Sequence, residues 1–314
     1  MHYTSVMRRF TTQTLYEITT TLEAQLRHLS VHETFSFEVL NPDLYVGVYS
    51  GQSVTINTEV YIYRNYHNWM NLAQALFCSM QTPVKVNETL VCLTFKKLDM
   101  NKSFHQQTVD VEQKYGDTSE FSNIHKNEES SFLLAYKHAL HLAKVKQRVR
   151  ILNLGINQGD EFEVILNIVK ESSHIELVGI DYCQSAIQKA QTKFFQPNMH
   201  FYAHDINTLD ELALGHFDLI ISVGTLQSTS INFKEVFMSL IQNYLQKNGA
   251  IILGFPNCRW SDGAMIYGAK MPNYEFSDMS LLIKDIYFCK KYLQQKKYRT
   301  YLNGKEYIFL TGVK

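Results

Sequence analysis

Val149-Arg150-Ile151-Leu152-Asn153-Leu154-Gly155-Ile156-Asn157-Gln158-Gly159-Asp160 is the stretch of this 314-residue chain that decides its fold. A short apolar run ends in a glycine-bearing turn, and an amphipathic helix follows. This order predicts a strand, a loop and a helix, with bare backbone able to approach a ligand at the loop. The next apolar run, residues 175–180, ends at Asp181. A glycine loop followed by such a carboxylate is how an α/β fold holds a nucleoside, because the carboxylate accepts hydrogen bonds from the ribose hydroxyls.

Strands and helices are expected to alternate from Val149 onward. The expected order is strand 149–154, helix 160–172, strand 175–180, helix 184–194, strand 199–203, a short helix near 208–213, strand 217–222, helix 232–246, strand 249–255, helix 277–297 and strands 298–302 and 306–310. The last two strands are joined at Asn303-Gly304, a strong hairpin signal. The alternation predicts an α/β fold: a Rossmann-like, doubly wound, mostly parallel seven-stranded sheet that ends in an antiparallel hairpin.

The first part of the chain has a different pattern. Apolar residues at helical spacing predict a helix over 13–29 and another over 66–80. Alternating apolar residues predict strands within 33–64, including one at 45–49, and near 90–98. We therefore expect three parts: an N-terminal α+β module at 1–100 for acceptor recognition or interaction, a polar connector or lid at 101–129, and a ligand-binding domain at 130–314.

Composition excludes several classes of protein. The formal net charge is zero, so no overall field attracts nucleic acid or acidic lipid. The five cysteines are odd in number, widely spaced and without a CxxC pair, which argues against a disulfide framework and a zinc cluster. No signal peptide or membrane-spanning run is recognisable. These features predict a cytoplasmic protein with neither a metal nor a membrane partner.

The glycine loop resembles the first motif of the class I S-adenosylmethionine-dependent methyltransferase superfamily, a Gly-x-Gly-x-Gly turn. Gly155 and Gly159 match its outer positions, and Asn157 stands at the middle one. Asparagine tolerates a positive φ better than most residues, so the turn can survive there. An acidic residue often precedes this turn by two positions in the family, and Asn153 occupies that position here.

Four further motifs follow in the family's order. The resemblance implies that Asp181 holds the ribose of S-adenosylmethionine and that Tyr182 packs against the adenine. It also implies that Asp205-Ile206 contacts the adenine and that Ser222-Val223 lines the methionine end; residues 245–253 match the entry into the fifth strand. The cofactor-binding residues it implies are Gly155, Asn157, Gly159, Asp181, Tyr182, Asp205, Ile206, Ser222 and Val223.

Other interpretations stay open. Singly, the glycines could close a tight turn, and Asp181 and Asp205 could be solvated carboxylates or helix N-caps. Together they fall at the carboxyl ends of successive strands, where open α/β sheets bind ligands. A nicotinamide-dependent oxidoreductase would need a third glycine where Asp160 stands, close to a pyrophosphate. A nucleoside-binding protein without turnover is the second alternative, motivated by the amides at Asn153 and Asn157.

Methyl transfer from a sulfonium is an in-line displacement that depends mainly on positioning, so no compulsory catalytic residue is expected. Asn257, Arg259 and Trp260 are the candidate acceptor contacts, with a loop packed on the N-terminal module weighted equally. His105 in the connector could act as a base, although an exposed loop histidine is the simpler interpretation. Lysines crowd the last helix and could contact RNA phosphates, against the default of a solvated face. The expected partner is a small-molecule or RNA acceptor, and a homodimer is compatible with the sequence.

Overall fold

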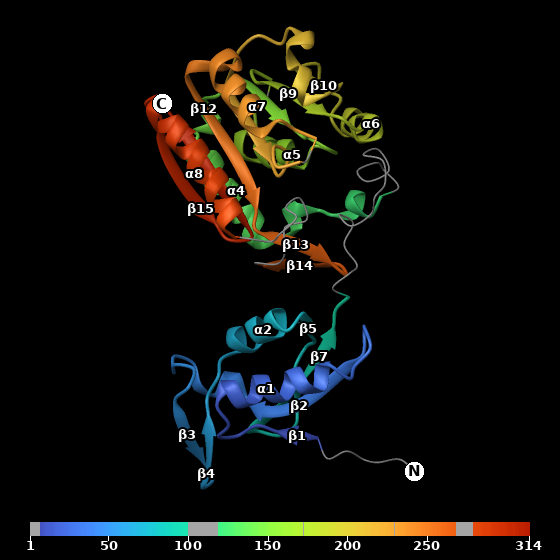
Figure 1. Ribbon diagram of the computed structural model, residues 1–314, viewed down its shortest axis with the longest axis vertical. Coiled ribbons are helices and arrows are strands. Elements are labelled where there is room, and N and C mark those ends of the chain that lie inside the picture. The colour runs from blue at the N-terminus through green and yellow to red at the C-terminus, as the bar shows by residue number, and fades with distance from the viewer. Residues whose placement is uncertain (1–6, 100–118, 172, 229, 268–278) are drawn as a thin grey trace. The chain divides into compact units, whose positions relative to one another are not determined.

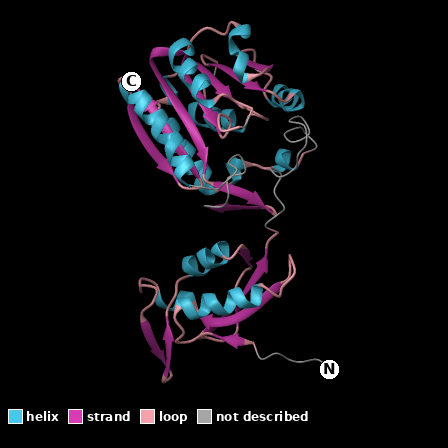
Figure 2. Ribbon diagram, in the orientation of Figure 1, coloured by secondary structure: helices cyan, strands magenta, loops and turns pink. Residues whose placement is uncertain are grey.

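The computed structural model describes residues 7–99, 119–171, 173–228, 230–267 and 279–314, so His105 and most of the expected connector lie outside the described residues. The chain divides into two compact units. The first comprises residues 1–102 with 261–264, and the second comprises residues 103–260 with 265–314. Helices and strands occur in both units (Figure 2), and each is described by itself below.

The first unit is a small α+β module. Its sheet has the order β1-β2-β7-β5, and β6 also pairs with β7. The elements are β1 (Arg8–Arg9), α1 (Leu15–Leu26), β2 (Thr34–Leu40), η1 (Pro42–Tyr45), β3 (Ser53–Ile56), β4 (Glu59–Ile62), α2 (Tyr66–Ala75), β5 (Cys78–Met80), β6 (Val84–Lys85) and β7 (Leu90–Lys97). Apolar residues of α1, α2 and the sheet form one core that includes Phe37, Phe95 and Trp69.

Two expectations for this unit were wrong. The strand expected at 45–49 is a turn of 3-10 helix, η1, followed by turns, because Pro42 fixes φ at its start and the Asn41 side chain accepts from the backbone N–H of Asp43. The helix expected over 66–80 ends at Ala75, and residues 78–80 pair with β7 instead. In both places backbone pairing or capping prevailed over the apolar pattern.

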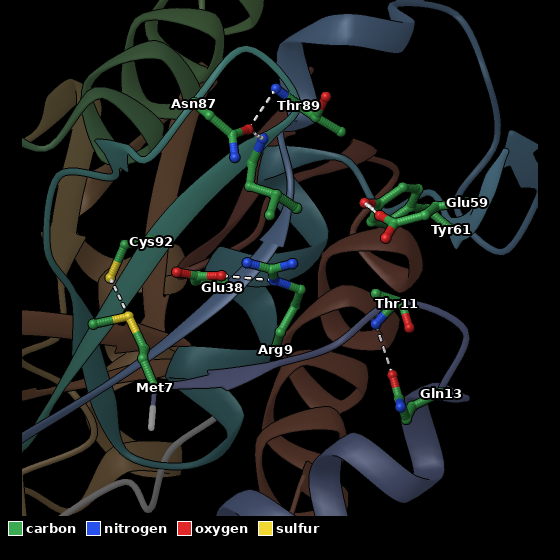
Figure 3. Close-up of polar contacts among 11 residues, drawn as sticks. Met7, Arg9, Thr11, Gln13, Glu38, Glu59, Tyr61, Asn87, Thr89 and Cys92 are labelled. Atoms are coloured by element: carbon green, nitrogen blue, oxygen red, sulfur yellow. Dashed lines mark hydrogen bonds and ion pairs between the residues drawn. The ribbon is translucent and has the colours of Figure 1, made fainter. Parts of the chain in front are cut away.

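Polar contacts fix the edge of this sheet at β1 (Figure 3). Arg9 forms an ion pair of 2.7 Å with Glu38 on the neighbouring strand β2. Next to β1, the sulfur of Met7 lies 3.6 Å from the Cys92 thiol on β7. In the separate two-stranded sheet of β3 and β4, the Tyr61 hydroxyl donates to Glu59. A two-residue edge strand therefore has a side-chain attachment in addition to its backbone pairing.

The second unit is a three-layer α/β domain with a seven-stranded sheet. The sheet order is β10-β9-β8-β11-β12-β16-β15. Its elements are α4 (Ser130–Leu142), η5 (Val145–Gln147), β8 (Arg150–Leu154), α5 (Asp160–Val169), β9 (Glu176–Asp181), α6 (Gln184–Lys193), β10 (Met199–Ala203), η6 (Ile206–Leu212), β11 (Phe217–Val223), α7 (Phe233–Ser239), the π-helical turn η7 (Leu240–Tyr244), β12 (Leu245–Pro256), α8 (Met279–Gln295), β15 (Arg299–Gly304) and β16 (Tyr307–Val313). Strands β8 to β12 are parallel, whereas β16 pairs antiparallel with both β12 and β15. The predicted Rossmann-like sheet with a terminal hairpin is confirmed.

Helices cover both faces of this sheet (Figure 1). Residues of α4, α5 and α6 form one core with one face, and residues of η6, α7 and α8 form a second core with the other. The strand order reverses between β8 and β11, since the chain proceeds outward from β8 in one direction and then returns to its other side. Open α/β sheets bind ligands at the carboxyl ends of the strands at such a switch point.

Two details of the second unit differ from expectation. Asn303 and Gly304 are the last residues of β15, so the turn of the terminal hairpin lies at residues 305–306. The long loop expected after β12 forms a two-stranded sheet of β13 (Cys258–Ser261) and β14 (Ala264–Tyr267). Backbone hydrogen bonding thus organises a segment whose sequence carries no clear strand periodicity.

The capping box of α1 gives a stability prediction. The Thr14 side chain accepts from the backbone N–H of Glu17, whose carboxylate accepts from the backbone N–H of Thr14 at 2.7 Å. Thr14→Ala should lower the free energy of unfolding of the first unit by about 1 kcal/mol. In a Trp260→Phe background, Trp69 is the one remaining indole of the chain's two and reports this unit in urea denaturation. Thr20→Ala, at an exposed site on the same helix, should cause no loss; an equal loss would contradict the capping role.

Candidate functional site

The glycine loop between β8 and α5 has the backbone that its sequence predicts. Gly155, Asn157 and Gly159 all have positive φ, at 72°, 47° and 91°. A Cβ on Gly155 would lie 1.9 Å from Oγ1 of Thr225, and one on Gly159 would lie 2.3 Å from the Phe194 ring. Glycine is therefore required at both positions by contact as well as by conformation. Asn157 adopts a left-handed φ although it has a side chain, which asparagine tolerates better than most residues.

Asp181, at the end of β9, fastens this loop to the neighbouring strand. One carboxylate oxygen accepts from the backbone N–H of Asn157 at 2.8 Å, and the other accepts from that of Cys183 at 3.0 Å. Burial raises the pKa of the Asp181 carboxyl above its ordinary value, although these two N–H groups act in the opposite direction. The backbone N–H of Tyr182 also acts on this carboxylate, which with about four acceptor sites can still accept from a further donor.

Four side chains near the carboxyl ends of β8 and β11 have buried polar atoms without a protein partner. Asn153, fully buried near the end of β8, has no hydrogen-bond partner for either its amide oxygen or its amide nitrogen. Oδ1 of Asn157, Oγ of Ser222 and Oε1 of Gln227 are also buried and unpaired. These groups come from the glycine loop, the ends of β8 and β11, and the loop after β11. Since buried polar groups are normally satisfied, this edge is suited to a polar ligand that both donates and accepts.

The segment before α4 contacts the glycine loop and the first turn of α5 through side-chain hydrogen bonds and an ion pair. The side chain of Gln158 donates to the carbonyl of Ser122 at 3.1 Å, and that of Asn127 donates to the carbonyl of Asp160 at 2.8 Å. Lys126 forms a buried ion pair of 3.0 Å with Glu161 in the first turn of α5. Burial alone would lower the pKa of Lys126, but the Glu161 carboxylate outweighs this and holds it above its ordinary value. The sequence interpretation missed both residues of this pair.

The first turn of α5 is acidic, with Asp160, Glu161 and Glu163. Lys193 neutralises part of this charge, at 3.7 Å from Asp160 and 3.0 Å from Glu163. A helix N-terminus attracts anions, but here carboxylates already occupy that position. A pyrophosphate beside this loop would meet negative charge where dinucleotide-binding folds present bare N–H groups.

The residues expected around an adenine lie along the same edge. Tyr182, directly after β9, is 55% exposed, and its ring is open to a ligand. The Asp205 side chain caps η6 by accepting from the backbone N–H of Asn207 at 2.8 Å. Ile206 is buried in the core beneath, and Val223 is buried at the end of β11. The Asp205 side chain is thus the N-cap of η6, while β9 and β11 flank β8 and β10 pairs with the far side of β9.

The three residues expected to contact the acceptor differ in the exposure of their side chains. Asn257 is buried; its backbone N–H donates to the carbonyl of Glu306 at 2.7 Å and its side chain donates to that of Lys305 at 3.1 Å. Arg259 is buried on β13, and burial lowers its pKa. Trp260 is partly exposed. Asn257 therefore joins β12 to the terminal hairpin, and Trp260 is the one of the three with an accessible side chain.

Within the part of the chain that the structure describes, no group of three or more His, Cys, Asp or Glu side chains could hold a metal ion. Among the same residues, no helix combines the length and the apolar character needed to span a bilayer.

Comparisons with known proteins address the second unit. The profile of a family described as "Methyltransferase domain" matches residues 146–305. A search of curated proteins finds no match. The structure of the plantazolicin methyltransferase BpumL in complex with SAH is similar, with 18% identity over 62% of this chain and 89% of that chain and a TM-score of 0.45. The N-terminal domain of EvdMO1 with SAH bound is also similar, with 15% identity over 59% of this chain and 84% of that chain and a TM-score of 0.39. An O-methyltransferase family protein from Burkholderia thailandensis is also similar. Its identity is 11% over 60% of this chain and 58% of that chain, and the TM-score is 0.42.

The close approach at Gly155 is testable. Gly155→Ala combines an unfavourable φ with overlap of the new Cβ and Thr225, so it should lower the melting temperature more than Gly51→Ala does. Gly51 also has a positive φ, of 100°, but its Cβ would meet nothing within 4 Å. Adding Thr225→Ala to Gly155→Ala should restore part of the loss. Equal effects of the two glycine substitutions would show that the contact with Thr225 is unimportant.

The buried ion pair gives a second prediction. Lys126→Met leaves the Glu161 carboxylate buried without its cation and should cost about 3–5 kcal/mol of unfolding free energy. Replacing both members, in Lys126→Met/Glu161→Leu, should cost much less because no charge is left unpaired. Scanning calorimetry of the three proteins measures this. If the double variant were less stable than Lys126→Met, the cost of an unpaired buried charge would not explain the effect, and the prediction would be wrong.

Proposed function

This chain belongs to the methyltransferase domain family, and we propose that it is an S-adenosylmethionine-dependent methyltransferase with a small-molecule or RNA acceptor. The observation that supports this reading most is the set of unpaired buried polar groups at the switch point of the sheet. They stand beside a carboxylate that keeps acceptor capacity. Together they suit a nucleoside that carries an amino acid, which both donates and accepts hydrogen bonds.

We assign the parts of the cofactor to the residues that fit them. Asp181 would accept from the ribose hydroxyls, and the glycine loop would pass close beneath the cofactor. Asn153, Ser222 and Gln227 would satisfy the methionine end, where donors and acceptors are both needed. Tyr182 and Asp205 would border the adenine. The acidic first turn of α5 tolerates a ligand without phosphate, which favours S-adenosylmethionine over a dinucleotide.

The bound cofactor supplies a methyl group that its sulfonium already activates for displacement. The protein's own residues then bind the acceptor, exclude water and hold the reacting atoms in line. We propose Trp260 and Arg259 as acceptor contacts, Trp260 by offering a flat apolar surface and Arg259 by its charge. Asn257 would act indirectly, by fixing the end of β12 against the hairpin. For residues 1–100 we propose a role in selecting the acceptor.

We further propose a cytoplasmic location. All five cysteines are free thiols, and four of them, Cys78, Cys183, Cys258 and Cys289, are buried. A reducing compartment preserves such thiols.

Calorimetric titration with S-adenosylhomocysteine tests the role of Asp181. Asp181→Ala removes the acceptor for the ribose and releases the loop, and it should lose roughly 1.5–3 kcal/mol of binding free energy, or about tenfold or more in affinity. Asp210→Ala, an exposed carboxylate on η6, is the control and should bind as the wild type does. Unchanged affinity in Asp181→Ala would refute the ribose assignment.

A further inference from the structure

One surface of the second unit has a charge pattern that the cofactor site does not explain. Between residues 284 and 299 the chain carries six cations and one carboxylate, Asp285. The cations are Lys284, Lys290, Lys291, Lys296, Lys297 and Arg299. Over the described residues, none of these six takes part in an ion pair. We call this surface, with Lys234 of α7, the α8 basic face.

The helix turns these cations outward. Leu282, Ile286, Cys289 and Leu293 are buried and form the side of α8 that packs on the sheet. Lys284 and Lys291 are exposed on the opposite side of the helix together with Tyr287, which is 59% exposed, and Lys296 and Lys297 are exposed directly after the helix ends at Gln295. From Lys284 to Gln295 the helix extends over about 16 Å, at 1.5 Å per residue, and Lys296 and Lys297 follow directly after it.

Aromatic rings are interleaved with the cations. Lys291 lies 5.7 Å from the centroid of the Tyr287 ring, and Lys296 lies 5.5 Å from that of Tyr292. Lys234 of α7 lies 5.3 Å from the centroid of Phe288. Lys234, Lys291 and Lys296 thus lie over aromatic rings, an interaction that is weak at exposed sites. A phosphate could draw them away at small cost.

The α8 basic face extends toward the carboxyl edge of the sheet, where the proposed cofactor residues lie. Arg299 pairs with Val313, which pairs with Ala250 near the start of the parallel part of β12, so the C-terminal end of α8 lies near the amino edge of the sheet. The helix extends along β12 and β15 from there (Figure 1). Its N-terminal half, with Lys284 and Tyr287, is therefore the half nearer the carboxyl edge, where the cofactor residues lie.

We propose that the α8 basic face binds the phosphate backbone of a single-stranded nucleic acid acceptor, with Tyr287 stacking on a base. Exposed cations on α8 and directly after it, with an exposed ring among them, match a chain of repeated phosphates and flat bases. A bilayer surface fits less well, because among the α8 side chains that the structure describes, from Leu282 onward, only Ile283 and Tyr287 are large, apolar and exposed. This inference rests on the proposed function, whose acceptor it narrows to a nucleic acid.

Fluorescence anisotropy of the full chain with a labelled 20-nucleotide single-stranded RNA, and with DNA of the same sequence, tests the proposal. The variant Lys284→Gln/Lys291→Gln/Lys296→Gln/Lys297→Gln should bind at least tenfold more weakly at low salt. Its slope of log affinity against log salt should be shallower by about 3 if each of four lysines meets a phosphate. Tyr287→Leu should weaken binding about tenfold with the slope unchanged.

The matched control makes the same change of charge elsewhere. Lys137→Gln/Lys144→Gln/Lys146→Gln/Lys170→Gln removes four exposed lysines from the side covered by α4 and α5 and should bind nearly as the wild type does. Binding of either nucleic acid with this contrast supports the proposal. No binding by the wild type at about 50 mM salt, or equal losses in the two quadruple variants, overturns it. S-adenosylhomocysteine titration of each protein separates the two proposals, because its failure in the wild type would refute the cofactor site, whereas its success beside absent nucleic-acid binding would refute the α8 basic face alone.

Discussion

The Asp181 carboxylate, which accepts backbone N–H groups from both the glycine loop and the turn after β9, is the contact on which the cofactor edge depends. Asn157 replaces the flexible middle glycine, so the loop needs an external fastening to keep its left-handed turn. The charge of the carboxylate makes that attachment strong, because hydrogen bonds to charged acceptors are stronger than those to neutral ones. Under the proposed function the same carboxylate would also accept from the ribose, so one side chain would couple loop geometry to ribose recognition.

The Lys126–Glu161 pair extends this support to the helix that follows the loop. A buried ion pair contributes little net stability, but losing one partner is costly, and that asymmetry resists rearrangement. With Gln158 and Asn127 bonded to neighbouring carbonyls, the segment before α4 is held against the loop. Asn153 remains buried and unpaired beside this rigid frame. A rigid frame around unsatisfied polar groups is the arrangement expected of a preformed ligand site.

The parallel sheet and the course of the glycine loop could be predicted from sequence, because period-two strands, helical periodicity and positive-φ residues are local signals. Lys126 and Glu161 could not, since they lie 35 residues apart and only the fold brings them together. The hydrogen bonds of Asn257 to the terminal hairpin could not be predicted either, because their partners lie at least 48 residues further along the chain. Residues 45–49 alternate like a strand yet follow the proline-initiated turn η1. Local patterns thus predicted local structure, and long-range pairing decided the rest.

Titration of the wild-type protein with S-adenosylhomocysteine and, separately, with NAD tests the central claim that this edge holds an amino-acid nucleoside and not a dinucleotide. Calorimetry should show micromolar binding of S-adenosylhomocysteine, since its donors and acceptors can satisfy Asn153, Ser222 and Gln227. It should show no binding of NAD, whose pyrophosphate would face the acidic first turn of α5. Binding of NAD, or of neither ligand, would contradict the account.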